Sequence, residues 1–239
     1  MQKFLRKNPK TPYIISVPHA GRFYPKLFLE NKSINLTLLK KMEDYKCDLI
    51  VKKIDKNLAD LIIADCSRVV VDLNRARNSI DNNMFEKNLN ITPSCDLTLI
   101  RAGLGIFPSK CYDSKIFNKR LPAEYKTIMI TKFYDTYHKL LNQIIKSHLI
   151  KFHYSILIDI HSTPSFSKNQ EYKLKDIIIS DNFGKSCPTN LRCFIHNYFK
   201  KNNLSVSINT PYSGGFITRS YGDKNKDVSA IQIEINKKL

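Results

Sequence analysis

One stretch, Tyr154–Ser165 (YSILIDIHSTPS), constrains the fold more than any other part of the chain. Ser155–Ile160 is largely apolar and β-branched, with Asp159 as the exception, and this predicts a strand buried on both faces. His161 follows the run, and in open α/β sheets the chemistry lies just beyond the carboxyl ends of the strands. His161 is therefore a candidate metal ligand or catalytic imidazole that Asp159 orients. On this motif alone, a structural histidine with satisfied hydrogen bonds is the better interpretation.

A second histidine follows a second apolar run. Pro12–Val17 (PYIISV) predicts another short strand, and it is followed at once by His19 in the small-residue turn PHAGR. Two strands that each deliver a histidine at the carboxyl end can bring two imidazoles together at one sheet edge. Such a pair suits a divalent metal, and zinc in hydrolytic sites usually takes a carboxylate as its third protein ligand.

Candidates for that carboxylate lie in one segment. The apolar spacing over Leu36–Leu61 predicts a mostly helical segment with one buried face. Asp44 and Asp48 stand four residues apart on it, and Glu43 precedes Asp44. Two interpretations stay open: a solvated acidic patch, or a group from which one carboxylate completes a metal site.

Apolar segments of strand and helix type alternate along the chain without a linker or repeat. Pro122–Leu149 is the clearest amphipathic helix, and Ser229–Asn236 (SAIQIEIN) predicts a final strand. We expect an α/β fold with a mixed, mostly parallel sheet flanked by helices, as a single domain over residues 1–239 with a flexible basic N-terminus at 1–10. In the final strand Glu234 faces away from the isoleucines, so it is either a general-base candidate or part of a polar edge.

The arginines are distributed differently from the lysines. The 39 basic residues are mostly lysines spread throughout the chain, whereas several of the few arginines fall in motif-like segments. Arg75 follows Asn74 after an apolar run, an arrangement suited to capturing a carboxylate with a bidentate contact. Arg68 lies inside that run and needs a partner if it is buried. Arg101 and Arg219 lie in two further glycine-containing segments.

The net charge of +18 raises the possibility of nucleic-acid binding. The even spread of lysine, with no arginine-rich block or zinc finger, favours a general compositional bias instead, and we expect nucleic acid not to be the main partner. No apolar run approaches the roughly 18 residues of a membrane span. The six cysteines show no CxxC pair, and with no secretory pattern they indicate reduced thiols in a cytoplasmic protein.

Eight motifs, taken in order, resemble those of the N-formylglutamate amidohydrolase family; they are PHAGRFYP, MEDYKCD, VVDLNR, RAGLG, LIDIHSTPS, DIIISDNFGKSC, PYSGGFITRSYG and IQIEIN. The resemblance covers nearly the whole chain. It implies a fold similar to the zinc carboxypeptidases and one divalent metal ion, zinc by analogy, held by His19, His161 and a carboxylate. Those carboxypeptidases place a glutamate three residues after the first histidine, where this chain has Arg22. The carboxylate must then come from elsewhere, and we favour Asp44 over Asp48 and Glu43.

The same resemblance implies hydrolysis of a small N-acyl amino acid, N-formyl-L-glutamate, to formate and L-glutamate. Glu234 would be the general base and Arg68 the oxyanion stabiliser. Asn74 and Arg75 would hold the α-carboxylate, and Arg101 or Arg219 the side-chain carboxylate. Two alternatives stay open: a zinc amidase or peptidase for another N-acylated amino acid, and a basic nucleic-acid-binding protein that keeps the fold without catalysis.

Overall fold

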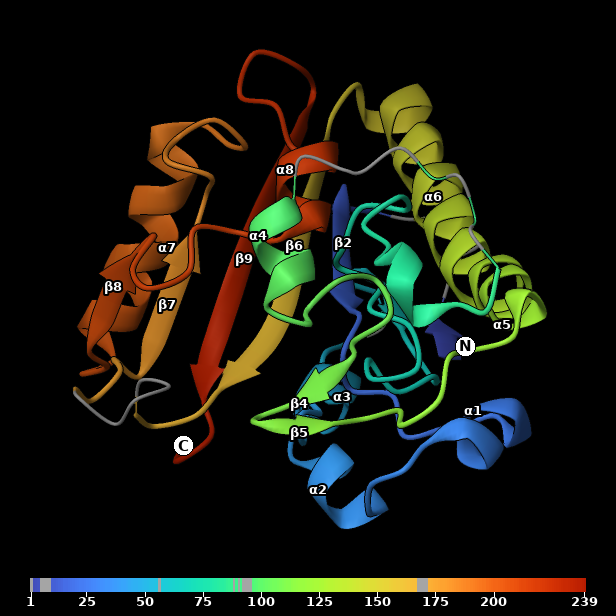
Figure 1. The fold of residues 1–239 in the computed structure, drawn as a ribbon. Helices are drawn as coiled ribbons and strands as arrows, with labels where there is room; N and C mark the ends of the chain where they lie inside the picture. The colour runs from blue at the N-terminus through green and yellow to red at the C-terminus, as the bar shows by residue number, and fades with distance from the viewer. Residues whose placement is uncertain are drawn as a thin grey trace. The chain divides into compact units, whose positions relative to one another are not determined.

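A seven-stranded sheet, in the order β1-β3-β2-β6-β9-β7-β8, is the central element of the computed structural model (Figure 1). The structure describes residues 2–4, 10–55, 57–87, 89, 91, 96–166 and 172–239. The sheet consists of β1 (Gln2–Phe4), β2 (Tyr13–Val17), β3 (Asp60–Ile63), β6 (Ser155–Thr163), β7 (Ile177–Ser180), β8 (Val206–Ile208) and β9 (Val228–Asn236). A separate antiparallel pair is formed by β4 (Lys110–Cys111) and β5 (Ser114–Lys115).

Strand direction confirms the expected mixed, mostly parallel sheet. β2 pairs in parallel with β3 and β6, β6 with β9, and β7 with β8, whereas β7 and β9 are antiparallel. In Figure 1 the arrowheads of β6 and β9 point the same way. The carboxyl ends of β2, β6 and β9 therefore lie at the same edge of the sheet.

Two compact units interleave along the chain. Unit 1 consists mainly of Pro18–Glu43 and Ala64–Leu140, and unit 2 of Lys3–Val17, Asp44–Ile63 and Leu141–Leu239. Strands β2, β3 and β6 to β9 all belong to unit 2. The single domain over residues 1–239 and the flexible N-terminus stay predictions; residues 2–4 form β1, and residues 1 and 5–9 lie outside the described part of the chain.

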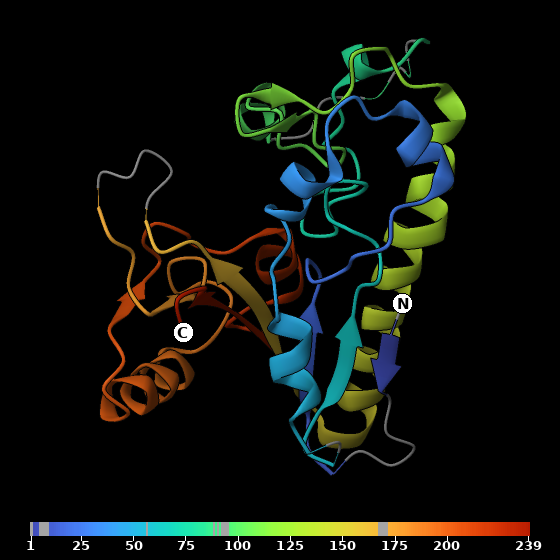
Figure 2. The same ribbon diagram turned by 90° about the horizontal axis from the view of Figure 1, so that it is seen from below.

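Some of the helices pack beside the strands of unit 2, as expected, and others belong to unit 1. They are α1 (Lys26–Asn31), α2 (Leu36–Lys40), α3 (Cys47–Lys52), α4 (Leu97–Arg101), α5 (Ala123–Met129), α6 (Thr136–Phe152), α7 (Thr189–Lys201) and α8 (Phe216–Tyr221), with a 3-10 turn η1 (Asn82–Met84) and a π-helical segment η2 (Ile130–Asp135). Within unit 2, α3 contacts β2 and β6, α7 contacts β7 and β8, and α8 contacts β9 (Figure 2). In the described part of the chain, no helix combines the length and apolar character needed to cross a membrane.

Each unit has its own apolar core. In unit 2 many β-branched and leucine side chains of the strands are fully buried, among them Ile14, Ile62, Leu157 and Ile231. Unit 1 relies more on aromatic rings, which pack edge to face; the rings of Phe107 and Tyr125, for example, lie 5.6 Å apart. The five described cysteines are free, in line with the expectation of reduced thiols, and Cys95 lies outside the described residues.

One prediction of local structure is wrong. The segment Leu36–Leu61 is not one helix, because α2 ends at Lys40 and α3 begins only at Cys47, after Lys46 takes a left-handed conformation with φ of 67°. The apolar segment Leu61–Leu73 contributes one strand, β3, and then leaves the sheet. Its valines are buried in a turn, where the backbone N–H of Val70 donates to the carbonyl of Ser67. Pro122–Leu149 is helical as expected, as α5, η2 and α6 in succession.

Candidate functional site

The polar face of β6 and β9 carries the best-placed candidates in unit 2. The two strands pair in register, with Asp159 opposite Gln232 and His161 opposite Glu234. Because side chains alternate along a strand, all four lie on one face of the sheet. The sequence predicted that His161 follows the end of the strand. In the structure β6 continues to Thr163, so His161 is one of the last three residues of the strand.

His161 lies between two carboxylates, and all three side chains are buried. Its Nδ1 is 2.8 Å from Oδ2 of Asp44, and its Nε2 is 2.8 Å from Oδ2 of Asp159. Ser16 on β2 donates its hydroxyl to the other oxygen of Asp159 at 2.5 Å. The contact expected between Asp159 and His161 is thus present, and Ser16 fixes the carboxylate that makes it.

Electrostatics favour a charged imidazole between these groups. Burial alone would lower the pKa of His161. The charge of Asp159 and the hydrogen bonds to Asp159 and Asp44 outweigh burial and hold the pKa of His161 well above its ordinary value. The charges of Asp44 and Asp159 would also favour a bound cation that contacts one nitrogen of a neutral His161.

The three candidate carboxylates separate clearly by their partners. Asp44 contacts His161 from the turn between α2 and α3. Asp48, in the first turn of α3, lies 3.5 Å from Nζ of Lys52. Glu43, which belongs to unit 1, accepts hydrogen bonds from the hydroxyls of Tyr24 and Ser67. Within these contacts only Asp44 meets one of the two candidate histidines.

In unit 1, Asp72 gathers His19 and two arginines. Its Oδ1 is 2.7 Å from Nε2 of His19 and accepts the backbone N–H of Asn74 at 2.9 Å. Its Oδ2 accepts from Nη2 of Arg68 at 2.9 Å and lies 3.9 Å from Nη2 of Arg75. Burial alone would raise the pKa of Asp72, but the charges of His19, Arg75 and Arg68 outweigh it and hold that pKa well below its ordinary value.

The turn after His19 depends on a glycine. Phe23 donates its N–H to the carbonyl of Asp65 at 2.8 Å, and Ser67 donates to the carbonyl of Phe23 at 3.0 Å. Gly21 lies so close to the carbonyl of Cys66 that a Cβ there would collide with it. Because Gly21 has no Cβ, the segment around His19 can pack closely against the segment that leads to Asp72.

The substrate-binding candidates differ in exposure. Asn74 is buried, and Arg75 donates from Nε to the carbonyl of Leu104 and from Nη1 to the carbonyl of Asn74, at 2.8 and 2.9 Å. Arg101 ends α4 in unit 1 and Arg219 lies in α8 in unit 2, and both are exposed. The roles of these four residues stay predictions.

Replacing Asp72 by asparagine is expected to lower the free energy of unfolding by about 3 kcal/mol, because it removes one partner of a buried ionic cluster. Since the pKa of Asp72 is lowered in the folded state, its contribution is present at neutral pH and is lost as the pH falls below the ordinary aspartate value of about 4. Urea unfolding measures both effects. Asp135→Asn, which breaks the exposed pair with Arg77, is the matched control and should cost less than about 1 kcal/mol; equal costs would contradict the assignment.

A family comparison decides what kind of protein carries this arrangement. The model of the family described as N-formylglutamate amidohydrolase matches residues 11–239. The chain belongs to the N-formylglutamate amidohydrolase family. The expected family resemblance is therefore confirmed over nearly the whole sequence.

Relatives agree with this family membership. The N-formylglutamate deformylase of Pseudomonas aeruginosa is 26% identical over 240 residues, which is 96% of this chain and 82% of the relative. That of Pseudomonas putida is 26% identical over 239 residues, covering 95% and 80%. A crystal structure of N-formylglutamate amidohydrolase from Ralstonia eutropha JMP134 superposes on all of this chain and 86% of its own with a TM-score of 0.90, at 23% identity, and supports the fold.

Two buried residues, Asp72 and Gln232, were not predicted as site residues from the sequence. Asp72 could have been found, because Arg68 needed a partner and Asp72 is the acidic residue four positions later in the same apolar run. Gln232 donates from Nε2 to Oε1 of Glu234 at 2.8 Å. An amide two residues before a candidate base gives no comparable warning in the sequence.

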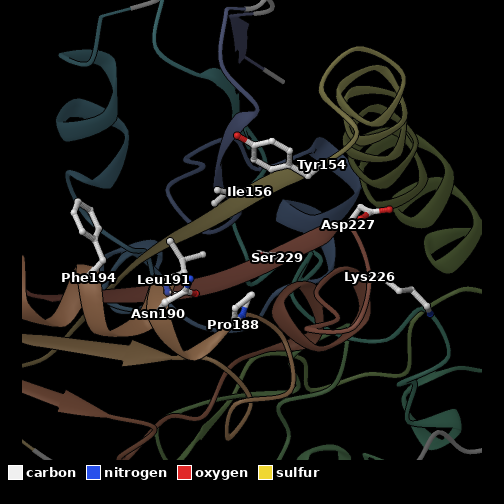
Figure 3. Close-up of a pocket in the computed structure, with 9 residues that line it drawn as sticks. All are labelled: Tyr154, Ile156, Pro188, Asn190, Leu191, Phe194, Lys226, Asp227 and Ser229. Carbon is white, nitrogen blue, oxygen red and sulfur yellow. Dashed lines mark hydrogen bonds between the residues drawn. The ribbon is translucent and has the colours of Figure 1, made fainter.

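A groove of about 480 Å³ lies elsewhere in unit 2 (Figure 3). Its lining includes Tyr154 and Ile156 at the start of β6, Asp227 and Ser229 at the start of β9, and Phe194 of α7. These are the amino ends of the strands. At about 3.3 Å per residue, Ile156 is roughly 16 Å along β6 from His161, so the groove is separate from the polar face that carries the candidate residues.

Proposed function

We propose that this chain hydrolyses the formyl amide of N-formyl-L-glutamate to formate and L-glutamate. The observation that carries the proposal is the polar face of unit 2, where His161 contacts Asp44 and Asp159 and lies in register with Glu234. Family membership and the names of the two Pseudomonas relatives support the reaction type and the substrate. The sheet edge at which these residues lie is the edge where α/β enzymes place their chemistry.

The proposal includes one divalent metal ion, zinc by its chemistry, held by His19, Asp44 and His161. Each of the three is buried and offers one ligand atom, and two imidazoles with one carboxylate form a common hydrolytic zinc set. Nδ1 of His161 and Oδ2 of Asp44 are already 2.8 Å apart. His19 follows the end of β2 by two residues, and Ser16 of the same strand bonds to Asp159.

The carboxylates behind the histidines support this donor set. Asp159 contacts Nε2 of His161, and Asp72 contacts Nε2 of His19. Ligating histidines commonly direct their second nitrogen to a carboxylate, which fixes the ring and makes the ligand more basic. A bound metal would supply Lewis acidity that polarises the amide and activates water.

The remaining residues take complementary roles. Glu234 accepts a proton from the attacking water and passes it to the leaving amine, so that the amide and water become formate and a free amino group. Arg68, fixed by Asp72, stabilises negative charge on the formyl oxygen. Asn74 and Arg75 hold the α-carboxylate, and Arg101 or Arg219 holds the side-chain carboxylate.

A second candidate is an amidase of the same type that acts on another N-acylated amino acid. It is favoured by the exposure of Arg101 and Arg219, because an exposed arginine discriminates less strongly for a second carboxylate than a buried one. Under this candidate the metal and Glu234 keep their roles, and only the side-chain preference changes.

Substrate preference separates the two candidates. We expect the highest kcat/KM on N-formyl-L-glutamate, a lower value on N-formyl-L-aspartate, and at least about 100-fold less on N-formyl-L-leucine, because the leucine derivative has no second carboxylate for an arginine to hold. Steady-state kinetics on the three compounds with the zinc-loaded protein make the measurement. Equal efficiency on the leucine derivative would favour the second candidate.

A further inference from the structure

The buried side chain of Gln232 lies between the candidate base and a loop of unit 2. Gln232 is 4% exposed and precedes Glu234 by two residues on the same face of β9. Its Nε2 donates to Oε1 of Glu234 at 2.8 Å, and its Oε1 accepts the backbone N–H of Gly215 at 2.8 Å. One amide therefore connects the carboxylate to the backbone just before α8.

The chemistry of the partners fixes which way this amide points. The backbone N–H of Gly215 can only donate, so it requires the oxygen of Gln232. The NH₂ group must then face Glu234, whose ionised carboxylate can only accept. A flipped amide would place donor against donor and acceptor against acceptor, so both neighbours select the same orientation.

Gly215 is itself held in place. It is the N-cap residue of α8, and the preceding loop is tied to the end of β7: Ser180 donates its hydroxyl to the carbonyl of Tyr212 at 2.7 Å, and Asn182 donates its N–H to the carbonyl of Ser213 at 2.8 Å. Ser180 is also the register partner of Gln232. The amide of Gln232 is thus set by β9 on one side and by an anchored loop on the other.

We infer that Gln232 is a positioning residue, whose amide holds the Glu234 carboxylate in the orientation that proton transfer requires. The inference rests on the proposed function, in which Glu234 is the base. A glutamate side chain has three rotatable bonds, and a general base must lie within about 2.6–3.2 Å of the proton that it takes. A directed hydrogen bond from a buried, doubly anchored amide removes much of that freedom before substrate arrives.

Gln232→Glu is the sharpest test. The new side chain keeps the shape of glutamine and can still accept from Gly215, but its carboxyl group faces that of Glu234. Two carboxyl groups this close share one proton, so Glu234 loses its neutral donor and becomes a poorer base. We expect kcat on N-formyl-L-glutamate to fall about 10- to 100-fold with KM changed by less than about threefold, because the effect lies on the chemical step. Gln232→Met, which loses both contacts, should fall at least as far.

The matched control is Ser186→Ala. Ser186 is fully buried and donates to the carbonyl of Ala230, two residues before Gln232 on β9, so the variant loses a comparable hydrogen bond to the same strand. It should keep wild-type kcat. If Gln232→Glu also keeps wild-type kcat while Gln232→Met loses it, Gln232 serves only to anchor Gly215 and the inference is overturned.

A second readout does not depend on activity. In ¹⁵N-labelled protein, the side-chain NH₂ signals of Gln232, assigned by their absence in Gln232→Glu, should move and exchange faster with solvent in Glu234→Ala. Unchanged signals would show that the amide does not donate to Glu234 and would overturn the inference. A wild-type protein that hydrolyses none of the three substrates but shows the NMR response would overturn the proposed function and, with it, the catalytic role of Gln232, while leaving the contact itself intact.

Discussion

Replacing Glu234 by glutamine is expected to lower kcat on N-formyl-L-glutamate by about 100-fold or more, while KM and bound metal stay close to wild type. Glutamine keeps the shape of the side chain and an oxygen that can accept from Gln232, but it cannot take a proton from water. General acid–base groups typically contribute about 10²- to 10⁴-fold. Steady-state kinetics with metal analysis on the same preparation separate the loss of the base from a loss of binding.

The control for this variant is Glu30→Gln, which removes a carboxylate whose side chain is 55% exposed and lies 3.6 Å from that of Lys26 on α1. It should leave kcat unchanged. A Glu234→Gln protein that turns over at the wild-type rate would remove Glu234 from the mechanism and leave the polar face of β9 without a catalytic part.

Replacing His161 by asparagine is expected to reduce bound zinc from about one per chain to less than about one-tenth, and to abolish hydrolysis. The change removes one of the three proposed metal ligands. It also removes the imidazole that lies between Asp44 and Asp159. Asparagine is preferred to alanine because its amide still gives both carboxylates a polar neighbour. Metal analysis after dialysis against zinc, with circular dichroism to establish that the protein is folded, makes the measurement.

His148 offers a closely matched control. It is fully buried in α6, and its Nε2 lies 2.8 Å from Oδ2 of Asp60, so His148→Asn disturbs a buried histidine–carboxylate pair that has no part in the proposed site. The His148→Asn protein should be less stable than wild type and should still bind one zinc ion per chain. Full zinc content in both His161→Asn and a companion His19→Asn would show that the metal is held elsewhere.

The strands and their polar residues could be predicted because a strand alternates its faces with a period of two. Asp159 and His161 interrupt one apolar run, and the parity of their positions places them on the same face of β6; within β9, parity likewise places Glu234 on the face opposite to the isoleucines. The register that sets His161 against Glu234 could not be predicted, because it depends on pairing between segments 73 residues apart in the sequence.

The errors have physical causes as well. Apolar spacing over Leu36–Leu61 fits a helix on either side of a break, and the contact that places Asp44 in a turn is with His161, 117 residues away. The spacing of Arg68 and Asp72 indicates that they could pair, but the contact of Asp72 with His19, 53 residues away in the sequence, could not be predicted. Gln232 acts through a backbone N–H in a loop, and no side-chain motif records such a partner.

The most direct test of the proposed reaction follows both products from one substrate. Zinc-loaded wild-type protein is mixed with N-formyl-L-glutamate carrying ¹³C in the formyl group, and formate and glutamate are measured together by NMR. We expect the two products to appear in equal amounts, at a rate that Glu234→Gln lowers by about 100-fold. An unchanged formyl signal after prolonged incubation of folded, zinc-loaded protein would contradict the account.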